Sequence, residues 1–205
     1  HLILLEKNKQ RYDYVKKIIQ ENNNINIFYA IDKNNKKNID YFVKKYNIKL
    51  FNYGEIACAL SHLLLIKNFI KSKSKYQIVL EDDLKIVKKL PTNENEVENI
   101  LKEININYDN IDILYLTKRV QKNNKYEFIN GCGTEGYILT KHGAKKIFNL
   151  LENGFDCPID IFLQKHYKNC YYLLDKNTDI INININAYCS KNNYIDLMDF
   201  PSSIR

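Results

Sequence analysis

The stretch YQIVLEDDLKI, residues 76–86, places the carboxylates of Glu81, Asp82 and Asp83 directly after an apolar run. Residues 78–80 suit a buried strand. Adjacent like charges repel each other, so solvent, neighbouring lysines or a metal ion must offset the electrostatic cost. The stretch therefore predicts a core strand that ends either in a solvated turn or in a cation-binding site.

Two of these acids are expected to face the same way. Side chains alternate sides along an extended segment, which puts Glu81 and Asp83 on one side and Asp82 on the other. Two carboxylates at i and i+2 offer hard oxygen ligands, which suit Mg²⁺ or Mn²⁺. The residues alone leave a second interpretation open, in which the acids of a solvated turn pair with Lys85, Lys88 or Lys89.

Strand-like and helix-like segments alternate along the first half of the chain and mix less regularly along the second. This order favours an α/β domain with a mostly parallel sheet and an antiparallel edge. Asp32, the acidic cluster and Lys118 fall at or just after predicted strand ends, where open α/β sheets bind ligands. Strands are expected at 1–6, 25–32, 76–80, 111–116, 126–129, 137–140, 170–174 and 179–186, and helices at 11–21, 39–46, 54–72, 94–104, 141–151 and 158–167.

Length and composition fit one sizeable folded domain or two very small ones. The 205 residues are 45% hydrophobic and 27% charged, and no apolar run approaches the ~20 residues that span a bilayer. The net charge of +7 raises the question of a nucleic-acid partner. Because the lysines are scattered and no RNA-recognition signature is present, we expect solvated lysine side chains rather than a nucleic-acid partner. An anionic small substrate, such as a nucleotide diphosphate, would suit the same charge.

The five cysteines show no CxxC spacing, which argues against a zinc finger or a thioredoxin-type site. An odd number in a domain of this size is typical of free, partly buried thiols in a reducing compartment, although one or two disulfides fit the same count. This segment also carries no signal-peptide pattern. Together these features favour a cytoplasmic location.

The stretch GEIACALSHLLL, residues 54–65, is expected to be a largely buried helix. Neighbours on a helix do not face each other, so Ser61 and His62 are not a nucleophile and its base. Glu55 and His62 lie seven residues apart and share one helix face. The free amides near Gly54 suit a phosphate. The alternative is a core helix with one hydrogen-bonded histidine.

Two later stretches carry weaker signals. The glycines of NGCGTEG, residues 130–136, permit tight turns or close approach of a ligand, yet their spacing matches neither a Rossmann fingerprint nor a P-loop. A hairpin loop explains them equally well. Asp160 falls in the first turn of a predicted helix, where it either favours the helix dipole or acts as a base.

In this order, four stretches resemble glycosyltransferase family 25: residues 54–62, 78–83, 131–147 and 158–163. The first strand with its polar turn and Arg11, and the second strand ending at Asp32, resemble the family as well. The resemblance implies a GT-A-like, Rossmann-related fold with helices on both faces of the sheet. It implies a single glycosyltransferase domain over 1–205, with a donor-binding half of about 1–118 and an acceptor-side half of about 119–205.

The resemblance also implies chemistry. The expected donor is UDP-galactose or UDP-glucose, and the expected acceptor is hydroxylysine or galactosyl-hydroxylysine of a collagen-like protein, or a lipooligosaccharide glycan. A non-catalytic nucleotide-sugar-binding relative is the alternative. Mn²⁺ or Mg²⁺ is expected on Glu81 and Asp83, with waters completing its shell, since a third protein ligand is not evident. Asp160 and then Glu135 are the candidate catalytic residues, and the candidate donor-binding residues are Arg11, Asp32, Glu55, Ser61, His62, Asp82, Gly133 and Thr134.

Overall fold

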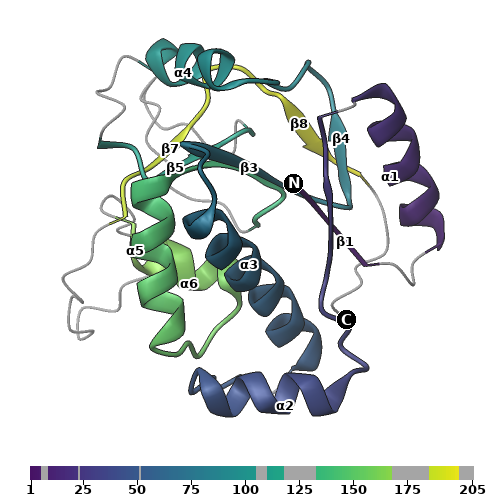
Figure 1. Cartoon of the computed structure of the whole chain (residues 1–205), viewed down its shortest axis with the longest axis vertical. Coiled ribbons are helices and arrows are strands. Elements are labelled where there is room, and N and C mark those ends of the chain that lie inside the picture. The colour runs from purple at the N-terminus through teal and green to yellow at the C-terminus, as the bar shows by residue number, and fades with distance from the viewer. Residues whose placement is uncertain are drawn as a thin grey trace.

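Six strands form one mixed sheet at the centre of the computed structural model, which describes residues 1–5, 9–22, 24–50, 52–104, 110–117, 133–167 and 185–198. The strand order is β2-β1-β3-β6-β5-β7 (Figure 1). Within this sheet β6 is antiparallel to both its neighbours, and the other pairs are parallel. The strands are β1 (Leu2–Leu4), β2 (Ile27–Tyr29), β3 (Tyr76–Glu81), β5 (Ile113–Tyr115), β6 (Gly136–Thr140) and β7 (Ala187–Cys189).

Helices cover both faces of the sheet, and each face has its own apolar core. Along β1, Ile3 packs into the first core and Leu2 and Leu4 pack into the second, as side-chain alternation on a strand requires. The first core includes residues of α2, α3, α5 and α6, and the second includes residues of α1 and α4 (Figure 1). The helices are α1 (Lys9–Glu21), α2 (Lys36–Lys45), α3 (Tyr53–Lys71), α4 (Glu94–Glu103), α5 (Lys141–Glu152) and α6 (Ile159–Lys165).

The parallel strands β2, β1 and β3 end almost level with one another. Ile3 pairs with Phe28 on one side and with Glu81 on the other. The residues that follow each strand therefore emerge together at the carboxyl edge of the sheet. Because β6 runs the opposite way, its first residue, Gly136, pairs with Leu80, which brings residues 133–135 to the same edge.

A second, two-stranded antiparallel sheet lies beside the acidic cluster. Its strands are β4 (Leu84–Ile86), which begins directly after Asp83, and β8 (Ile195–Leu197). The amide of Met198 donates a hydrogen bond of 2.9 Å to the carbonyl oxygen of Asp83. A late segment of the chain thus holds the far end of the acidic cluster in place.

Side chains mark the starts of the long helices. The Asn52 carboxamide oxygen accepts hydrogen bonds from the Gly54 and Glu55 amides at the start of α3, at 2.8 and 3.4 Å. Asn93 accepts from the Glu96 amide at 3.0 Å at the start of α4. Such caps satisfy amides that have no partner within the helix, and so fix where each helix begins.

The predicted fold class is confirmed: the chain is α/β with a mostly parallel sheet and helices on both faces, as in a GT-A-like fold. Antiparallel pairing occurs at β6 inside the sheet and in the small β4–β8 sheet. The second strand is shorter than predicted, because it ends at Tyr29. The strands at 84–86, 187–189 and 195–197 are not predicted by the sequence pattern. The predictions for 126–129, 170–174, most of 179–186 and Lys118 lie outside the described residues.

Cys58 and Cys157 are free thiols, as the cysteine count suggested, while Cys132 and Cys170 lie outside the described residues. Among the described helices, none has both the length and the apolar character that crossing a bilayer requires.

Gly143, in the first turn of α5, lies against the backbone of the segment that enters β5. A Cβ atom at this position would lie 2.1 Å from the carbonyl oxygen of Asp112. The contact involves backbone atoms, which cannot rotate away as a side chain can. Gly143 therefore sets how closely α5 approaches the sheet.

We predict that Gly143→Ala lowers the free energy of unfolding by about 3 kcal/mol, because overpacking against backbone forces α5 to move. Urea denaturation followed by circular dichroism measures the loss. Lys145→Ala, at an exposed position of the same helix, is the control and should change stability by less than about 0.5 kcal/mol. Equal stabilities for the two variants would contradict the close contact.

Candidate active site

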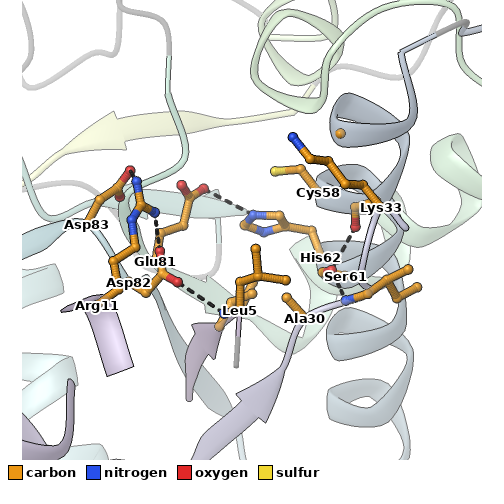
Figure 2. A pocket seen from close by; sticks show the side chains of 14 residues that line it. Leu5, Arg11, Ala30, Lys33, Cys58, Ser61, His62, Glu81, Asp82 and Asp83 are labelled. Atoms are coloured by element: carbon orange, nitrogen blue, oxygen red, sulfur yellow. Dashed lines mark hydrogen bonds and ion pairs between the residues drawn. The ribbon is translucent and has the colours of Figure 1, made fainter. Parts of the chain in front are cut away.

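A pocket opens at the carboxyl edge of β1, β2 and β3 (Figure 2). Its lining combines basic, acidic, thiol and imidazole side chains from four parts of the chain: α1, the segment after β2, α3 and the end of β3. The functional side chains that line it are Arg11, Lys33, Cys58, Ser61, His62, Glu81, Asp82 and Asp83.

Asp82 is fixed by Arg11 and by the end of β1. The guanidinium of Arg11 donates a short hydrogen bond to Oδ1 of Asp82, and the Leu5 amide donates to Oδ2 at 3.0 Å. The Arg11 and Asp82 side chains are 3% and 8% exposed. A buried carboxylate needs such partners, since burying an unpaired charge costs several kcal/mol. Both oxygens of Asp82 are thus committed to holding the acidic cluster against β1 and α1.

The conformation assumed for the three acids is wrong. The strand ends at Glu81, and Asp82 and Asp83 form a turn that leads into β4. Alternation along a strand therefore does not place the Asp83 side chain. Arg11 contacts both aspartates, with its Nη2 atom 3.5 Å from Oδ2 of Asp83. The partner of the two aspartates is thus an arginine from α1, whereas the solvated-turn interpretation expected a lysine at 85, 88 or 89.

Glu81 points toward α3, on the same side of β3 as Val79 of the first core. His62 Nε2 lies 3.2 Å from its Oε1 atom, and the Thr134 hydroxyl donates a short hydrogen bond to the same oxygen. Burial alone would raise the pKa of Glu81. The hydrogen bonds from His62 and Thr134 and the charge of Arg11 outweigh burial and lower the pKa below its usual value. Glu81 is therefore an ionised carboxylate at neutral pH.

Asp83 has the opposite balance. Burial, followed by the negative charge of Glu81, raises the pKa of Asp83 from 3.8 to about 6, although Arg11 opposes the shift. Its Oδ1 atom is buried and has no hydrogen-bond partner among the described residues. The two carboxylates therefore lie close enough to repel each other, and the surrounding cations do not fully compensate them.

His62 is held by a chain of buried aromatic residues. Its Nδ1 atom lies 2.8 Å from the Tyr137 hydroxyl, and the two rings stack with centroids 5.9 Å apart. The Tyr137 ring packs beside that of Tyr115, whose hydroxyl makes a short hydrogen bond to the hydroxyl of Tyr167. Tyr137 thus fixes the imidazole so that Nε2 faces Glu81 and the pocket (Figure 2).

Ser61 joins α3 to the segment after β2. Its hydroxyl donates to the carbonyl of Ala57 at 2.7 Å and accepts from the amide of Ile31 at 2.9 Å. These partners differ from those of His62, in agreement with the expectation that the two neighbours do not act as a nucleophile–base pair. The Ser61 bond positions the segment that carries Lys33, whose side chain extends over the pocket near Cys58 (Figure 2).

The segment before β6 adds further residues to this edge. Gly133 has a φ of 127°, a conformation that glycine adopts readily. Thr134 and Glu135 follow it and are buried, and the Glu135 carbonyl accepts a hydrogen bond of 2.8 Å from the Glu81 amide. Asp160, in the first turn of α6, is near enough that its charge contributes to raising the pKa of the Cys58 thiol, after burial and Glu81.

The sequence of the chain matches a model of Glycosyltransferase family 25 (LPS biosynthesis protein) over residues 1–163. This range contains every residue that lines the pocket. The chain belongs to glycosyltransferase family 25. One relative, Procollagen galactosyltransferase 1-B of Xenopus laevis, is 29% identical over 125 residues, which cover 56% of this chain. The chain spans about a fifth of the length of that curated relative, because the aligned region is 20% of it.

Apart from Asp160, which lies in α6, the predicted site residues of this family 25 protein fall into three groups. Six of them line the pocket together, and Gly133, Thr134 and Glu135 lie behind Glu81. Asp32 and Glu55 do not line the pocket, but each lies next in sequence to a residue that does. Asp32 accepts hydrogen bonds from the amide and side chain of Asn34, and Glu55 follows the pocket residue Gly54.

Three residues of the candidate site were not predicted from the sequence. Cys58 precedes His62 by four positions, and this i, i+4 spacing on a predicted helix was a usable signal. Tyr137 lies in a predicted strand, and nothing in the sequence shows that its hydroxyl reaches α3. Lys33 follows a predicted strand end directly, which placed it at the correct edge, yet it stands among many other lysines.

We predict that Arg11→Met lowers the free energy of unfolding by about 3 kcal/mol, because it leaves the buried Asp82 carboxylate without its ionic partner. Chemical denaturation near neutral pH measures the change. Lys17→Met, at an exposed position of the same helix, should be close to neutral. A small effect at position 11 would show that the ion pair does not support the acidic turn.

We also predict that Asp83→Asn stabilises the metal-free protein near pH 8 by about 1–3 kcal/mol. The folded-state pKa of about 6 exceeds the ordinary 3.8, so the charged form of Asp83 costs stability above pH 6. Below about pH 4 the carboxyl is protonated in both states and the gain should vanish. Urea titrations in a chelating buffer test this, with the exposed Asp13→Asn as the control. A gain that does not depend on pH would contradict the assignment.

Proposed function

We propose that this protein transfers a hexose, galactose or glucose, from a UDP-sugar to a hydroxyl acceptor with the help of a divalent cation, Mn²⁺ or Mg²⁺. The observation that carries the proposal is the pair of adjacent carboxylates, Glu81 and Asp83, in a pocket at the carboxyl edge of parallel strands. Ligands of open α/β sheets bind at this edge. Membership of family 25 supports sugar transfer.

The acidic turn fits a hard divalent cation. Glu81 is ionised, and Asp83 carries a buried oxygen that lacks a hydrogen-bond partner among the described residues. A divalent ion would be bound by these two carboxylates, waters and the donor phosphates, which is the usual set of ligands for Mg²⁺ and Mn²⁺. When bound, the ion supplies positive charge to the diphosphate leaving group. Asp82 takes no part in this binding, since Arg11 and Leu5 occupy its oxygens.

Lys33 is the candidate for direct contact with the diphosphate. Its side chain lies over the pocket opposite the acidic turn, and Ser61 fixes the segment that carries it (Figure 2). An ammonium group there would favour an anionic donor, and it would stabilise the negative charge that develops as the sugar leaves. Arg11 contributes charge from the other side, although its guanidinium mainly supports Asp82.

Asp160 is the better candidate for work on the acceptor side. It is partly exposed in the first turn of α6, whereas Glu135 is buried, with 6% exposure. If the reaction inverts the sugar, Asp160 takes the proton of the acceptor hydroxyl as general base. If the reaction retains the configuration, Asp160 orients the acceptor. Glu135 is better placed to support Glu81 and Tyr115 from within the fold.

Two kinds of acceptor are consistent with the comparisons. The name of the Xenopus laevis relative points to a collagen-like acceptor, and the family description points to a lipopolysaccharide. We favour a hydroxyl on a collagen-like protein, such as hydroxylysine, because the matched relative is a procollagen galactosyltransferase. A hydroxylysine peptide and a lipooligosaccharide acceptor tested side by side separate the two.

We predict that UDP and Mn²⁺ together raise the melting temperature by roughly 5–10 °C when UDP is at about 100 times its Kd. Each alone should do less, because cation and diphosphate bind as a unit. Differential scanning fluorimetry measures the shift. Asp83→Asn should abolish the joint effect although the same change stabilises the metal-free protein. Asp13→Asn serves as the matched control.

Sugar transfer is then tested by release of UDP from UDP-galactose and UDP-glucose, with and without acceptor. Loss of release in Asp83→Asn and its retention in Asp13→Asn are expected. Absence of both a thermal shift and UDP release in the unmodified chain would overturn the proposal. A shift without release under every donor and acceptor would instead identify a nucleotide-sugar-binding protein without transferase activity.

A further inference from the structure

Three different metal-ligating side chains converge on one point of the pocket wall. The Cys58 sulfur, a His62 ring nitrogen and a Glu81 carboxylate oxygen all lie within 4.8 Å of one another. Cys58 and His62 occupy i and i+4 positions of α3 and therefore share one helix face. Glu81 reaches them from the end of β3 (Figure 2). Two elements packed in the first core thus hold the three donor atoms together.

The spacing suits a small tetrahedral ion. Two ligands about 2.0 Å from a tetrahedral centre lie about 3.3 Å apart, and a sulfur ligand lies slightly farther away. His62 Nε2 and Glu81 Oε1 are 3.2 Å apart. The Cys58 sulfur lies within 4.8 Å of the other two donor atoms, so it must approach them by roughly 1 Å to complete a tetrahedral set.

The ligands are also supported from behind, as metal ligands usually are. Tyr137 holds the other ring nitrogen of His62 at 2.8 Å, and Thr134 holds the Glu81 carboxylate. In the empty protein Nε2 faces Glu81 as a hydrogen-bond partner. When an ion takes the place of that hydrogen bond, the neutral imidazole keeps its proton on Nδ1, donates it to the Tyr137 oxygen and offers the Nε2 lone pair to the ion. His62 itself is 1% exposed, so its orientation is fixed by packing.

We propose that Cys58, His62 and Glu81 form a binding site for a thiophilic divalent cation, with Zn²⁺ as its occupant. A thiolate and an imidazole favour Zn²⁺ over Mn²⁺ or Mg²⁺, which prefer oxygen ligands. Three protein ligands leave the fourth position open to the pocket, where a water or a substrate oxygen binds. The Cys58 thiol gives up one proton when its sulfur binds the ion.

Both cations would use the Glu81 carboxylate, so they would compete for it. This competition rests on the proposed function, whereas binding of Zn²⁺ by the three side chains does not. Zn²⁺ on the Cys58 side withdraws Glu81 from Asp83, and thereby removes half of the protein ligands offered to Mn²⁺. The pocket wall would therefore make the enzyme sensitive to the ratio of Zn²⁺ to Mn²⁺ around it.

Spectroscopy with Co²⁺, together with calorimetric titration with Zn²⁺, tests the site without reference to sugar transfer. The chelator-treated protein should show a thiolate-to-cobalt charge-transfer band on addition of Co²⁺, and Zn²⁺ should displace it. Cys58→Ser should abolish the band and weaken Zn²⁺ binding by at least about 10-fold, because even a supporting residue contributes that much. Tyr137→Phe should weaken binding by about 10-fold and keep the band. Cys157→Ser, which removes another partly buried free thiol, should change neither measurement.

A band and a Zn²⁺ affinity that persist in Cys58→Ser overturn the proposal, as does the absence of any thiolate band in the unmodified protein. Melting curves confirm that each variant is folded before titration. The thermal shift with UDP and Mn²⁺ is measured on the same samples. If the thermal shift is present and the cobalt band is absent, the zinc site is wrong and the transferase proposal stands. If the cobalt band is present and the thermal shift is absent, the zinc site stands and the transferase proposal loses its support.

Discussion

The buried ion pair between Arg11 and Asp82 is the interaction on which the pocket depends. The middle one of the three consecutive carboxylates is buried, so it needs a positive partner that replaces water. Arg11 of α1 is this partner, and the Leu5 amide completes the set. With Asp82 committed inward, the flanking acids are left to face the pocket. A basic residue ten positions after the start of the chain thereby decides which acids remain available for binding.

Stability and binding oppose each other in the acidic turn. Glu81 is stabilised as an anion by donors, while Asp83 is held in a position that disfavours its charge. A fold selected only for stability would replace Asp83 with a neutral residue. Its unfavourable placement is understandable if a cation arrives with the ligand and relieves the repulsion. The repulsion that destabilises the empty protein is relieved when the cation binds, and this relief then contributes to the affinity for the cation.

The sequence predicted the order of strands and helices well, because apolar periodicity and helix-start residues are local signals. It also predicted the edge of the sheet at which the pocket lies, since strand ends can be recognised locally. It failed where a contact joins distant segments. The turn at Asp82 follows from Arg11, which is 71 residues away, and the orientation of His62 follows from Tyr137, 75 residues away. Strand alternation could not reveal either partner. Short strands such as β4 and β8 form because they pair with each other, and neither carries a strong pattern of its own.

The reversed direction of β6 has a consequence for how this protein can diversify. In a sheet of parallel strands alone, a segment that enters a strand lies at the edge opposite to the pocket. Here the connection from β5 to β6 leaves the sheet after Tyr115 and returns before Gly136 at the edge where the acids lie. Because both ends of that connection emerge at this edge, insertions, deletions and exchanges between them could change the surroundings of the pocket, while the register of both strands stays unchanged. One inverted strand thus gives the scaffold a place to vary the surroundings of the pocket without altering its core.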